Sequence, residues 1–212
     1  IINMHNQEKS LIDSLIDEIQ YGLATIYSND MPENHNDNTT KLDKQQKLQS
    51  ERIMRINHMG EICAQALYRG QAAFTKETKI KSQLYKICDE ENHHLELCNL
   101  RLTELNGKKS ILNPLWYSAS FALGALAGLN ENQWKLGFIE ETEKQVKNHL
   151  EDSIASLPVE DSRSKMFLEE IAEDEEKHRD TVKDIGSEDI PEFVKGGMGI
   201  FSKIMKKITY HI

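Results

Sequence analysis

Glu91-Asn92-His93-His94 carries the strongest structural signal in this sequence, and Glu175-Glu176-Lys177-His178 repeats it. Both stretches contain Glu-x-x-His, and two residues that are three apart on a helix point in the same direction. Each pair can therefore offer one carboxylate oxygen and one imidazole nitrogen to a single metal ion. Two such pairs from two helices, with a lone Glu from each of two more, form a dinuclear metal site inside a four-helix bundle. The repeat predicts an all-α fold with this kind of site.

The apolar periodicity around each motif indicates which residues face the core. The first motif is ambiguous, because Glu90/His93 and Glu91/His94 both have the required spacing. The apolar stripe selects the second pair, since it runs through Leu84, Ile87, Glu91, His94, Cys98, Leu102 and Leu105. Glu90 and His93 fall instead on the polar face, as do Gln83, Lys86 and Arg101. The second motif sits in a similar stripe of Leu168, Ile171, Glu175, His178 and Val182.

Two further glutamates are candidates on the other helices. Glu143 interrupts an apolar stripe in the same way, on a predicted helix over residues 131–157. Glu61 lies on a predicted helix over 51–75 and is followed by Ala64 and Tyr68 one and two turns on, although by itself it would pass as an ordinary helix Glu. The two motif helices are predicted over 79–106 and 160–185. Buried carboxylates are costly unless they are paired or bind metal, and two ferrous ions would neutralise four of them. Oxygen ligands with only two imidazoles favour iron or manganese. The alternative is a buried Glu–His hydrogen bond on each helix.

The segments outside these four helices have a different character. Residues 7–27 predict an amphipathic helix and residues 28–50 a polar linker, so we divide the chain into 1–50 and a metal-binding domain over 51–212. Residues 114–129 contain no charge, and as a helix they would span roughly 24 Å. This is short of the roughly 30 Å hydrocarbon core. A buried crossover helix and a helix dipping into one leaflet are both open interpretations.

The C-terminal segment is basic and apolar on an otherwise acidic chain. Residues 193–212 contain four Lys and no acid, whereas the whole chain of 212 residues has a net charge of −9. The segment resembles an interfacial membrane helix, although a helix docked on the bundle is the rival interpretation. The overall charge argues against nucleic acid as the main partner. Cys63, Cys88 and Cys98 form no CxxC, and we expect Cys88 and Cys98 to be small core residues in a reducing compartment. We expect no signal peptide.

Several motifs in order resemble the Coq7 family of demethoxyubiquinone hydroxylases, which are ferritin-like di-iron carboxylate proteins. They are RINHMGE at 55–61, ALYRGQ at 66–71, LNPLWY at 112–117, GALAG at 124–128, ETE at 141–143 and Glu175-x-x-His178. The resemblance covers roughly residues 48–212 and is closest to bacterial members. Met59 stands where the family more often has Ala.

The resemblance implies a fold, a site and a reaction. The fold would be a ferritin-like four-helix bundle with an added N-terminal helix, an uncharged crossover helix and a C-terminal amphipathic helix. The metal ligands would be Glu61, Glu91, His94, Glu143, Glu175 and His178, holding two Fe ions. With O2 as co-substrate, the enzyme would hydroxylate the ring of a polyprenylated demethoxyubiquinol in ubiquinone biosynthesis.

The resemblance also implies a location and partners. The protein would be peripheral on the cytoplasmic side of the cell inner membrane, where it could meet other ubiquinone-biosynthesis proteins. Two alternatives remain. One is a rubrerythrin- or ferritin-like peroxidase or ferroxidase, which needs no uncharged helix. The other is a non-catalytic scaffold of a quinone-biosynthesis complex, which would bind no stoichiometric iron.

Overall fold

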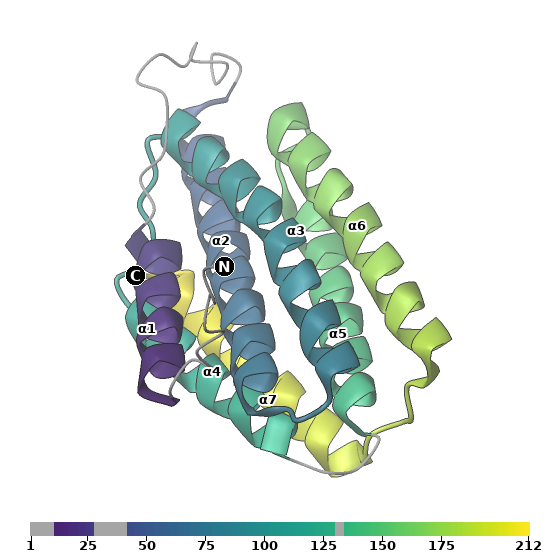
Figure 1. The fold of residues 1–212 in the computed structure, drawn as a ribbon. Helices are drawn as coiled ribbons and strands as arrows, with labels where there is room; N and C mark the ends of the chain where they lie inside the picture. The colour runs from purple at the N-terminus through teal and green to yellow at the C-terminus, as the bar shows by residue number, and fades with distance from the viewer. Residues whose placement is uncertain (1–10, 28–41, 130–133) are drawn as a thin grey trace, which may run out of the picture.

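The computed structural model describes residues 11–27, 42–129 and 134–212 (Figure 1). Within these ranges the chain forms helices and no strand, which confirms the all-α prediction. The helices are α1 (Leu11–Tyr27), α2 (Lys44–Phe74), α3 (Thr78–Glu104), α4 (Asn113–Leu129), α5 (Trp134–Ser156), α6 (Ser162–Gly186) and α7 (Glu192–Thr209). Parts of two predicted helices, residues 7–10 and 131–133, lie outside the described ranges.

Two helical hairpins build a four-helix bundle of the ferritin-like type. α2 packs on α3, α5 packs on α6, and the hairpins face one another through α2 against α5 and α3 against α6. Two apolar clusters fill the bundle. One extends from Ile53 on α2 to Ile171 on α6, and the other from Ala64 on α2 to Val182 on α6. The polar residues selected from the sequence lie between these clusters, so the surrounding core shields them from water.

α2 begins seven residues earlier than the sequence analysis predicts. It starts at Lys44 instead of Glu51 because Asp43 forms a capping box with Gln46. The Asp43 carboxylate accepts from the backbone N–H groups of Gln45 and Gln46, and the Gln46 side chain accepts from the Asp43 N–H. Residues 44–50 of the predicted linker are therefore helical. Residues 28–41 of that linker lie outside the described ranges.

Arg101 is buried, although its place in the sequence pattern predicts a solvent-facing side chain. Only 1% of it is exposed. Its guanidinium pairs with Asp161 at 2.8 Å and Glu104 at 2.9 Å, and its Nε donates to the Ser164 hydroxyl. A buried arginine is tolerable when its charge and donors are satisfied in this way. The network joins the end of α3 to the start of α6, the two helices that carry Glu-x-x-His.

Glycines allow α4 to pack against α2 at backbone distance. A Cβ built on Gly124 would lie 1.9 Å from the Leu67 carbonyl oxygen, and one on Gly70 would lie 2.2 Å from the Phe121 carbonyl oxygen. Any side chain at these positions would push the helices apart. The sequence left open whether residues 114–129 are a crossover helix or touch lipid. Its inner face is packed on α2, while its outer face is exposed.

α1 and α7 lie on either side of α4 outside the bundle. Gly22 of α1 faces the ring of Tyr117 on α4, where an added Cβ would lie 2.7 Å from Tyr117 Cε1. On the other side, Trp116 of α4 makes an edge contact with Phe201 of α7 at a centroid distance of 6.4 Å. α1 and α7 also contact α2. The three helices thus form a partial outer layer beside the ligand helix α2 (Figure 1).

Candidate metal centre

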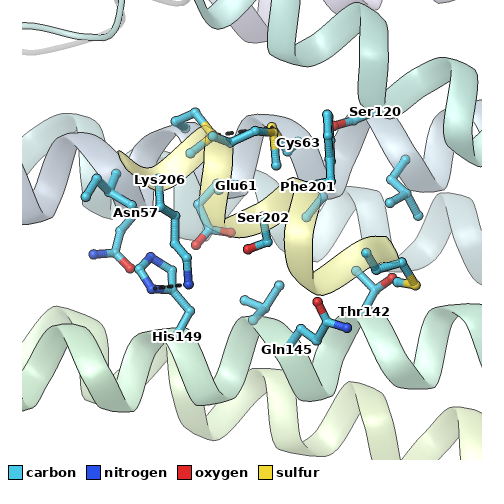
Figure 2. A pocket seen from close by; sticks show the side chains of 18 of the residues that line it. Asn57, Glu61, Cys63, Ser120, Thr142, Gln145, His149, Phe201, Ser202 and Lys206 are labelled. Carbon is cyan, nitrogen blue, oxygen red and sulfur yellow. Dashed lines mark hydrogen bonds between the residues drawn. The ribbon is translucent and has the colours of Figure 1, made fainter. Parts of the chain in front are cut away.

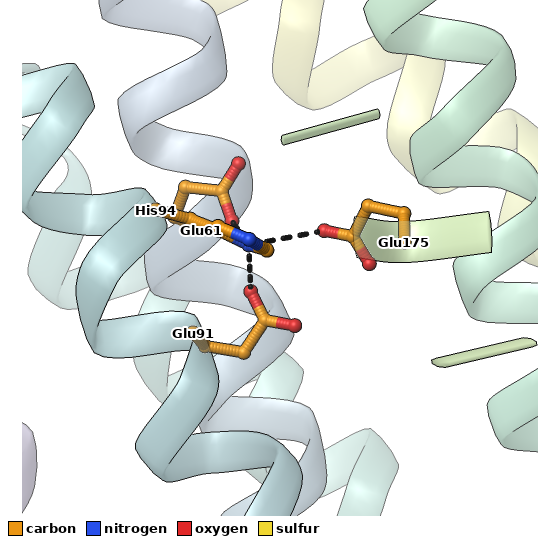
Figure 3. A group of neighbouring side chains, drawn as sticks. All are labelled: Glu61, Glu91, His94 and Glu175. Carbon is orange, nitrogen blue, oxygen red and sulfur yellow. Dashed lines mark hydrogen bonds and ion pairs between the residues drawn. The ribbon is translucent and has the colours of Figure 1, made fainter. Parts of the chain in front are cut away.

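The structure brings all six predicted ligands together in two overlapping groups. Within each group the donor atoms lie within 4.8 Å of one another. The first group, drawn in Figure 3, contains Glu61, Glu91, His94 and Glu175. The second contains Glu91, Glu143, Glu175 and His178. Glu91 and Glu175 belong to both groups, so these two carboxylates would be shared if each group held an ion.

Each of the four bundle helices contributes to the cluster as its apolar periodicity predicts. Glu61 comes from α2, Glu143 from α5, and the two Glu-x-x-His pairs from α3 and α6. The four glutamates and His94 are no more than 1% exposed, and His178 is 9% exposed. These side chains are therefore isolated from bulk water in the middle of the bundle.

The same nitrogen of each histidine faces the carboxylates. His94 Nδ1 lies 3.0 Å from Glu91 Oε2, 3.6 Å from Glu175 Oε1 and 3.9 Å from Glu61 Oε2. His178 Nδ1 lies 3.4 Å from Glu91 Oε1 and 3.7 Å from Glu175 Oε2. Nδ1 is thus the nitrogen that each ring would offer to a metal ion.

The opposite nitrogens contact two acidic residues that sequence reasoning did not select. Nε2 of His178 lies 3.0 Å from Glu90 Oε2, and Nε2 of His94 lies 3.5 Å from Asp174 Oδ2. Each carboxylate comes from the helix opposite the histidine it contacts. The signal in the sequence is an acidic residue immediately before the Glu of each motif, as in Glu90-Glu91 and Asp174-Glu175. Such a carboxylate fixes the tautomer of a metal-binding histidine.

His93 confirms the assignment of helical phase on α3. Its side chain is 54% exposed and pairs with Glu170 on the outside of the bundle. Glu90 is also substantially exposed at 44%, as predicted, but its carboxylate reaches inward to His178. His149 and His58 belong to neither group. Burial lowers the pKa of each of these two histidines to about 3, with Lys206 adding to the effect at His149 and Lys109 at His58.

The donor set matches what a pair of divalent cations requires. In the protein alone, several atoms of the cluster are buried without a hydrogen-bond partner. They are both oxygens of Glu143 and Glu175, one oxygen each of Glu61 and Glu91, and Nδ1 of His178. Burial and the nearby Glu91 raise the pKa of Glu61 well above its usual range. Burial and the nearby Glu175 do the same to the pKa of Glu143. Orphaned buried acceptors of this kind are expensive, and bound cations would satisfy them. The residues present therefore suit a dinuclear metal site.

The histidines are held in the protonated form by their neighbours. Burial opposes the charge of His94, yet the neighbouring carboxylates of Glu175 and Glu91 raise its pKa to about 12. The same balance raises the pKa of His178 to about 10. Burial likewise opposes ionisation of Glu175, but the neighbouring side chains of Glu143, His178 and His94 outweigh it and hold its pKa below the usual range. Metal binding at Nδ1 must therefore displace protons from both rings.

A cavity of about 110 Å³ adjoins the cluster on the side of Glu61. Its walls come from α2, α4, α5 and α7 and are mostly apolar. Figure 2 shows the polar groups that line it, including Glu61, Gln145, Ser202 and the pair His149–Lys206. His149 Nδ1 and Lys206 Nζ are 3.5 Å apart. The cavity thus joins a member of the first group to a polar, cationic patch on α5 and α7.

All three cysteines are buried and free, which confirms the prediction made for Cys88 and Cys98. Cys88 and Cys98 pack inside the two apolar clusters, and Cys63 lies beside Met59 and Met205. None of them belongs to the metal-ligating groups of the described residues. They act as small core side chains.

Comparison with known proteins agrees with this geometry. The family model described as ubiquinone biosynthesis protein COQ7 matches residues 48–209. A 3-demethoxyubiquinol 3-hydroxylase from Xanthomonas oryzae pv. oryzae (strain PXO99A) is 41% identical over 207 residues, covering 96% of this chain and 95% of its own. The protein of that name from Laribacter hongkongensis is 39% identical over 206 residues, covering 95% of this chain and 100% of its own. That from Acinetobacter baylyi is 46% identical over 160 residues, covering 76% of each chain.

The match extends over all four bundle helices and every residue of the metal-ligating groups. Identity of about 40% over nearly the full length of both chains is far above what a shared fold alone would produce. The chain belongs to the COQ7 family of ubiquinone biosynthesis proteins.

Proposed function

We propose that this protein hydroxylates the ring of a polyprenylated demethoxyubiquinol in ubiquinone biosynthesis, using O2 and two iron ions. The observation that carries the proposal is the duplicated, buried carboxylate–histidine cluster in a chain of this family. Relatives that align over nearly their full length bear the name of this hydroxylase. Two bound iron ions would supply the reduction of O2 and the transfer of one oxygen atom to a ring carbon.

The six clustered residues would hold the metal ions in the proposed enzyme. Glu91 and Glu175 would bridge, while Glu61 with His94 and Glu143 with His178 would complete the two ends. Glu90 and Asp174 would hold the histidine rings through Nε2. The apolar clusters on both sides would exclude water, which protects a reactive centre from side reactions.

The cavity beside Glu61 is the site that we propose for the quinol ring. It is apolar enough to accept a substituted ring, and its polar groups are the kind that bind ring oxygens. Lys206 can donate to a quinol or methoxy oxygen, and Gln145 can donate or accept. Leu123 of α4 lines the cavity and is also 38% exposed, which gives a prenyl chain an apolar path from the outside.

We propose a peripheral position on the cytoplasmic side of the inner membrane, and the outer helices support the membrane contact. Among described residues, eighteen large apolar side chains are exposed, and twelve of them lie on α1, α4 and α7. Only three lie on the longer helices α2, α3, α5 and α6, so the apolar surface is concentrated on the outer layer. Concentrated exposed apolar surface marks protein or membrane contacts. No helix in the described part of the chain is long and apolar enough to span a bilayer.

The test is a single-turnover reaction with isotopically labelled oxygen. Reduced protein loaded with two iron ions is mixed with a prenylated demethoxyubiquinol and 18O2, and the product is analysed by mass spectrometry. One 18O atom in the new hydroxyl, with none from labelled water, is the expected result. Label from water alone, or consumption of peroxide with the quinol unchanged, would favour the peroxidase alternative. Absence of stoichiometric iron would favour the scaffold.

A further inference from the structure

α1 contributes no metal ligand, yet it is fixed to the bundle by a charged and aromatic cluster. Glu18 is 7% exposed and accepts two hydrogen bonds from Arg69 of α2, at 2.7 and 3.0 Å. The Arg69 guanidinium lies 3.8 Å from the ring centroid of Tyr21 and 4.8 Å from that of Tyr85. Tyr85 also donates to Glu18 at 3.1 Å. This bidentate pair between two aromatic rings is a specific attachment, not a loose apolar contact.

A chain of hydrogen bonds continues from this cluster to the metal centre. The Tyr21 hydroxyl donates to Gln65 Oε1 at 3.0 Å. The Thr25 hydroxyl lies 3.4 Å from the same oxygen, and its single proton has a shorter partner in the Tyr21 backbone carbonyl at 3.0 Å. Gln65 is fully buried, and its Nε2 donates to the backbone carbonyl of Glu91 at 3.2 Å. Tyr21 thus lies two hydrogen bonds away from a residue that belongs to both ligand groups.

The direction of each hydrogen bond determines how the Gln65 amide is oriented. A backbone carbonyl can only accept, so the Gln65 –NH2 must face Glu91 and the amide oxygen must face α1. The Tyr21 hydroxyl on α1 supplies the donor that this oxygen needs. Burial raises the pKa of Tyr21 to about 12, so its hydroxyl stays protonated and able to donate at neutral pH. Without α1, the amide would lose the partner that holds it in this orientation.

Gln65 is also well placed to affect the ligands themselves. It lies one helical turn after Glu61 on α2, and its side chain crosses to Glu91 on α3. It therefore ties two ligand-bearing helices together next to the cluster. A shift of Glu91 would alter both metal ions, because this residue is shared between the groups.

We propose that Gln65 is a positioning residue for Glu91 and that α1, through Tyr21, holds the Gln65 amide in place. The inference rests on the proposed function, since it concerns the same metal centre. It gives the N-terminal helix a role in the site that the sequence alone did not reveal.

The experiment titrates metal-free protein with Co²⁺, whose visible absorption reports the geometry of its ligands. The variants are Tyr21→Phe and Gln65→Met, and the matched control is Tyr85→Phe. Tyr21 and Tyr85 both flank Arg69, and each substitution removes one hydroxyl. Only the Tyr21 hydroxyl donates to Gln65. We expect Tyr21→Phe and Gln65→Met to weaken Co²⁺ binding about tenfold and to change the visible spectrum. Tyr85→Phe should match the unaltered protein in both measurements.

Equal effects of Tyr21→Phe and Tyr85→Phe would overturn the proposal, since the role of α1 would then be general stabilisation. An unchanged spectrum in Tyr21→Phe and Gln65→Met would overturn it as well. Should Gln65→Met fail to fold, Tyr21→Phe decides the question, because it keeps the ring on Arg69. Failure of the unaltered protein to bind Co²⁺ would instead contradict the proposed metal centre, so the two failures are distinguishable.

Discussion

Glu90 Oε2 lies 3.0 Å from Nε2 of His178, although Glu90 is on the outer face of α3 and His178 belongs to the cluster on α6. Asp174 of α6 makes the reciprocal contact with His94 of α3. The two motif helices are therefore linked twice, each carboxylate holding the histidine of the other helix. Once the Nδ1 proton is released, a histidine whose Nε2 donates to a carboxylate presents the lone pair of Nδ1 inward.

Glu90→Ala and Asp174→Ala should each weaken binding of divalent metal by about 10- to 100-fold. The physical reason is that each change frees one imidazole to rotate and removes the acceptor that selects its tautomer. The measurement is competitive titration of metal-free protein against a chelator of known affinity. Circular dichroism should show an unchanged helix content, because both residues lie near the surface.

His93→Ala is the matched control for these variants. His93 lies beside His94 in sequence but pairs with Glu170 outside the bundle. Its removal should leave metal affinity unchanged within a factor of two to three, roughly the scatter of such measurements. If His93→Ala lost metal while Glu90→Ala and Asp174→Ala did not, the assignment of helical phase on α3 would be wrong.

Metal binding should become tighter as the pH rises from 5.5 to 8. The pKa values of His94 and His178 are raised to about 12 and 10, so both rings carry a proton throughout this range when no metal is bound. Raised pKa values of Glu61 and Glu143 add to the number of bound protons. Metal competes with these protons and must release them. Proton release can be measured with a pH indicator in weakly buffered solution, and release that does not differ from zero would contradict the assignment.

The sequence predicted the bundle and the cluster because both follow from periodicity. A Glu or His at a core position of an apolar stripe is costly, so Glu91, Glu143 and Glu175 were visible as exceptions to a regular pattern. The same reasoning failed for Arg101, which lies off the stripe yet is buried by contacts with Asp161 and Glu104. Glu104 is three residues away on the same helix, but Asp161 comes from a distant segment, and helical spacing contains no information about that contact.

Contacts between helices explain the other differences. Glu90 was assigned to solvent from its position on α3, and its exposure agrees, but its partner His178 is on α6. The attachment of α1 through Arg69 and Gln65 likewise depends on tertiary packing. The early start of α2 does not depend on tertiary contacts, because the capping box of Asp43 and Gln46 can be recognised in the sequence itself.

Gly124→Ala should destabilise the protein by about 3 kcal/mol, because its Cβ would overlap the carbonyl oxygen of Leu67 and force α4 away from α2. Gly60→Ala is the control, since a Cβ there meets nothing within 4 Å. This second change should stabilise α2 by about 0.5–1 kcal/mol through helix propensity. Urea unfolding followed by circular dichroism measures both. Equal effects of the two substitutions would show that α4 does not pack at backbone distance.

Charged substitutions on the exposed apolar side chains of the outer layer should reduce binding to vesicles. Leu23→Asp on α1 and Leu126→Asp on α4 alter residues that are 52% and 65% exposed. Each places a charge where an apolar side chain would enter the lipid, so the fraction of protein that floats with vesicles should fall. Val159→Asp is the control, because Val159 is 96% exposed in the turn between α5 and α6, away from the outer layer. A comparable loss in Val159→Asp would exclude the outer layer as the specific contact.

Reversing the exposed charges of α7 should weaken binding to anionic vesicles in particular. Lys203 and Lys207 are exposed on α7, whereas Lys206 is half-buried beside His149 in the cavity and is left unchanged. Each lysine near an anionic surface contributes about 1 kcal/mol, and salt screens this attraction. Lys203→Glu with Lys207→Glu should therefore reduce flotation with anionic vesicles at low salt and leave flotation with neutral vesicles unchanged. If the unaltered protein bound neutral and anionic vesicles equally at every salt concentration, attachment would depend on the apolar side chains alone.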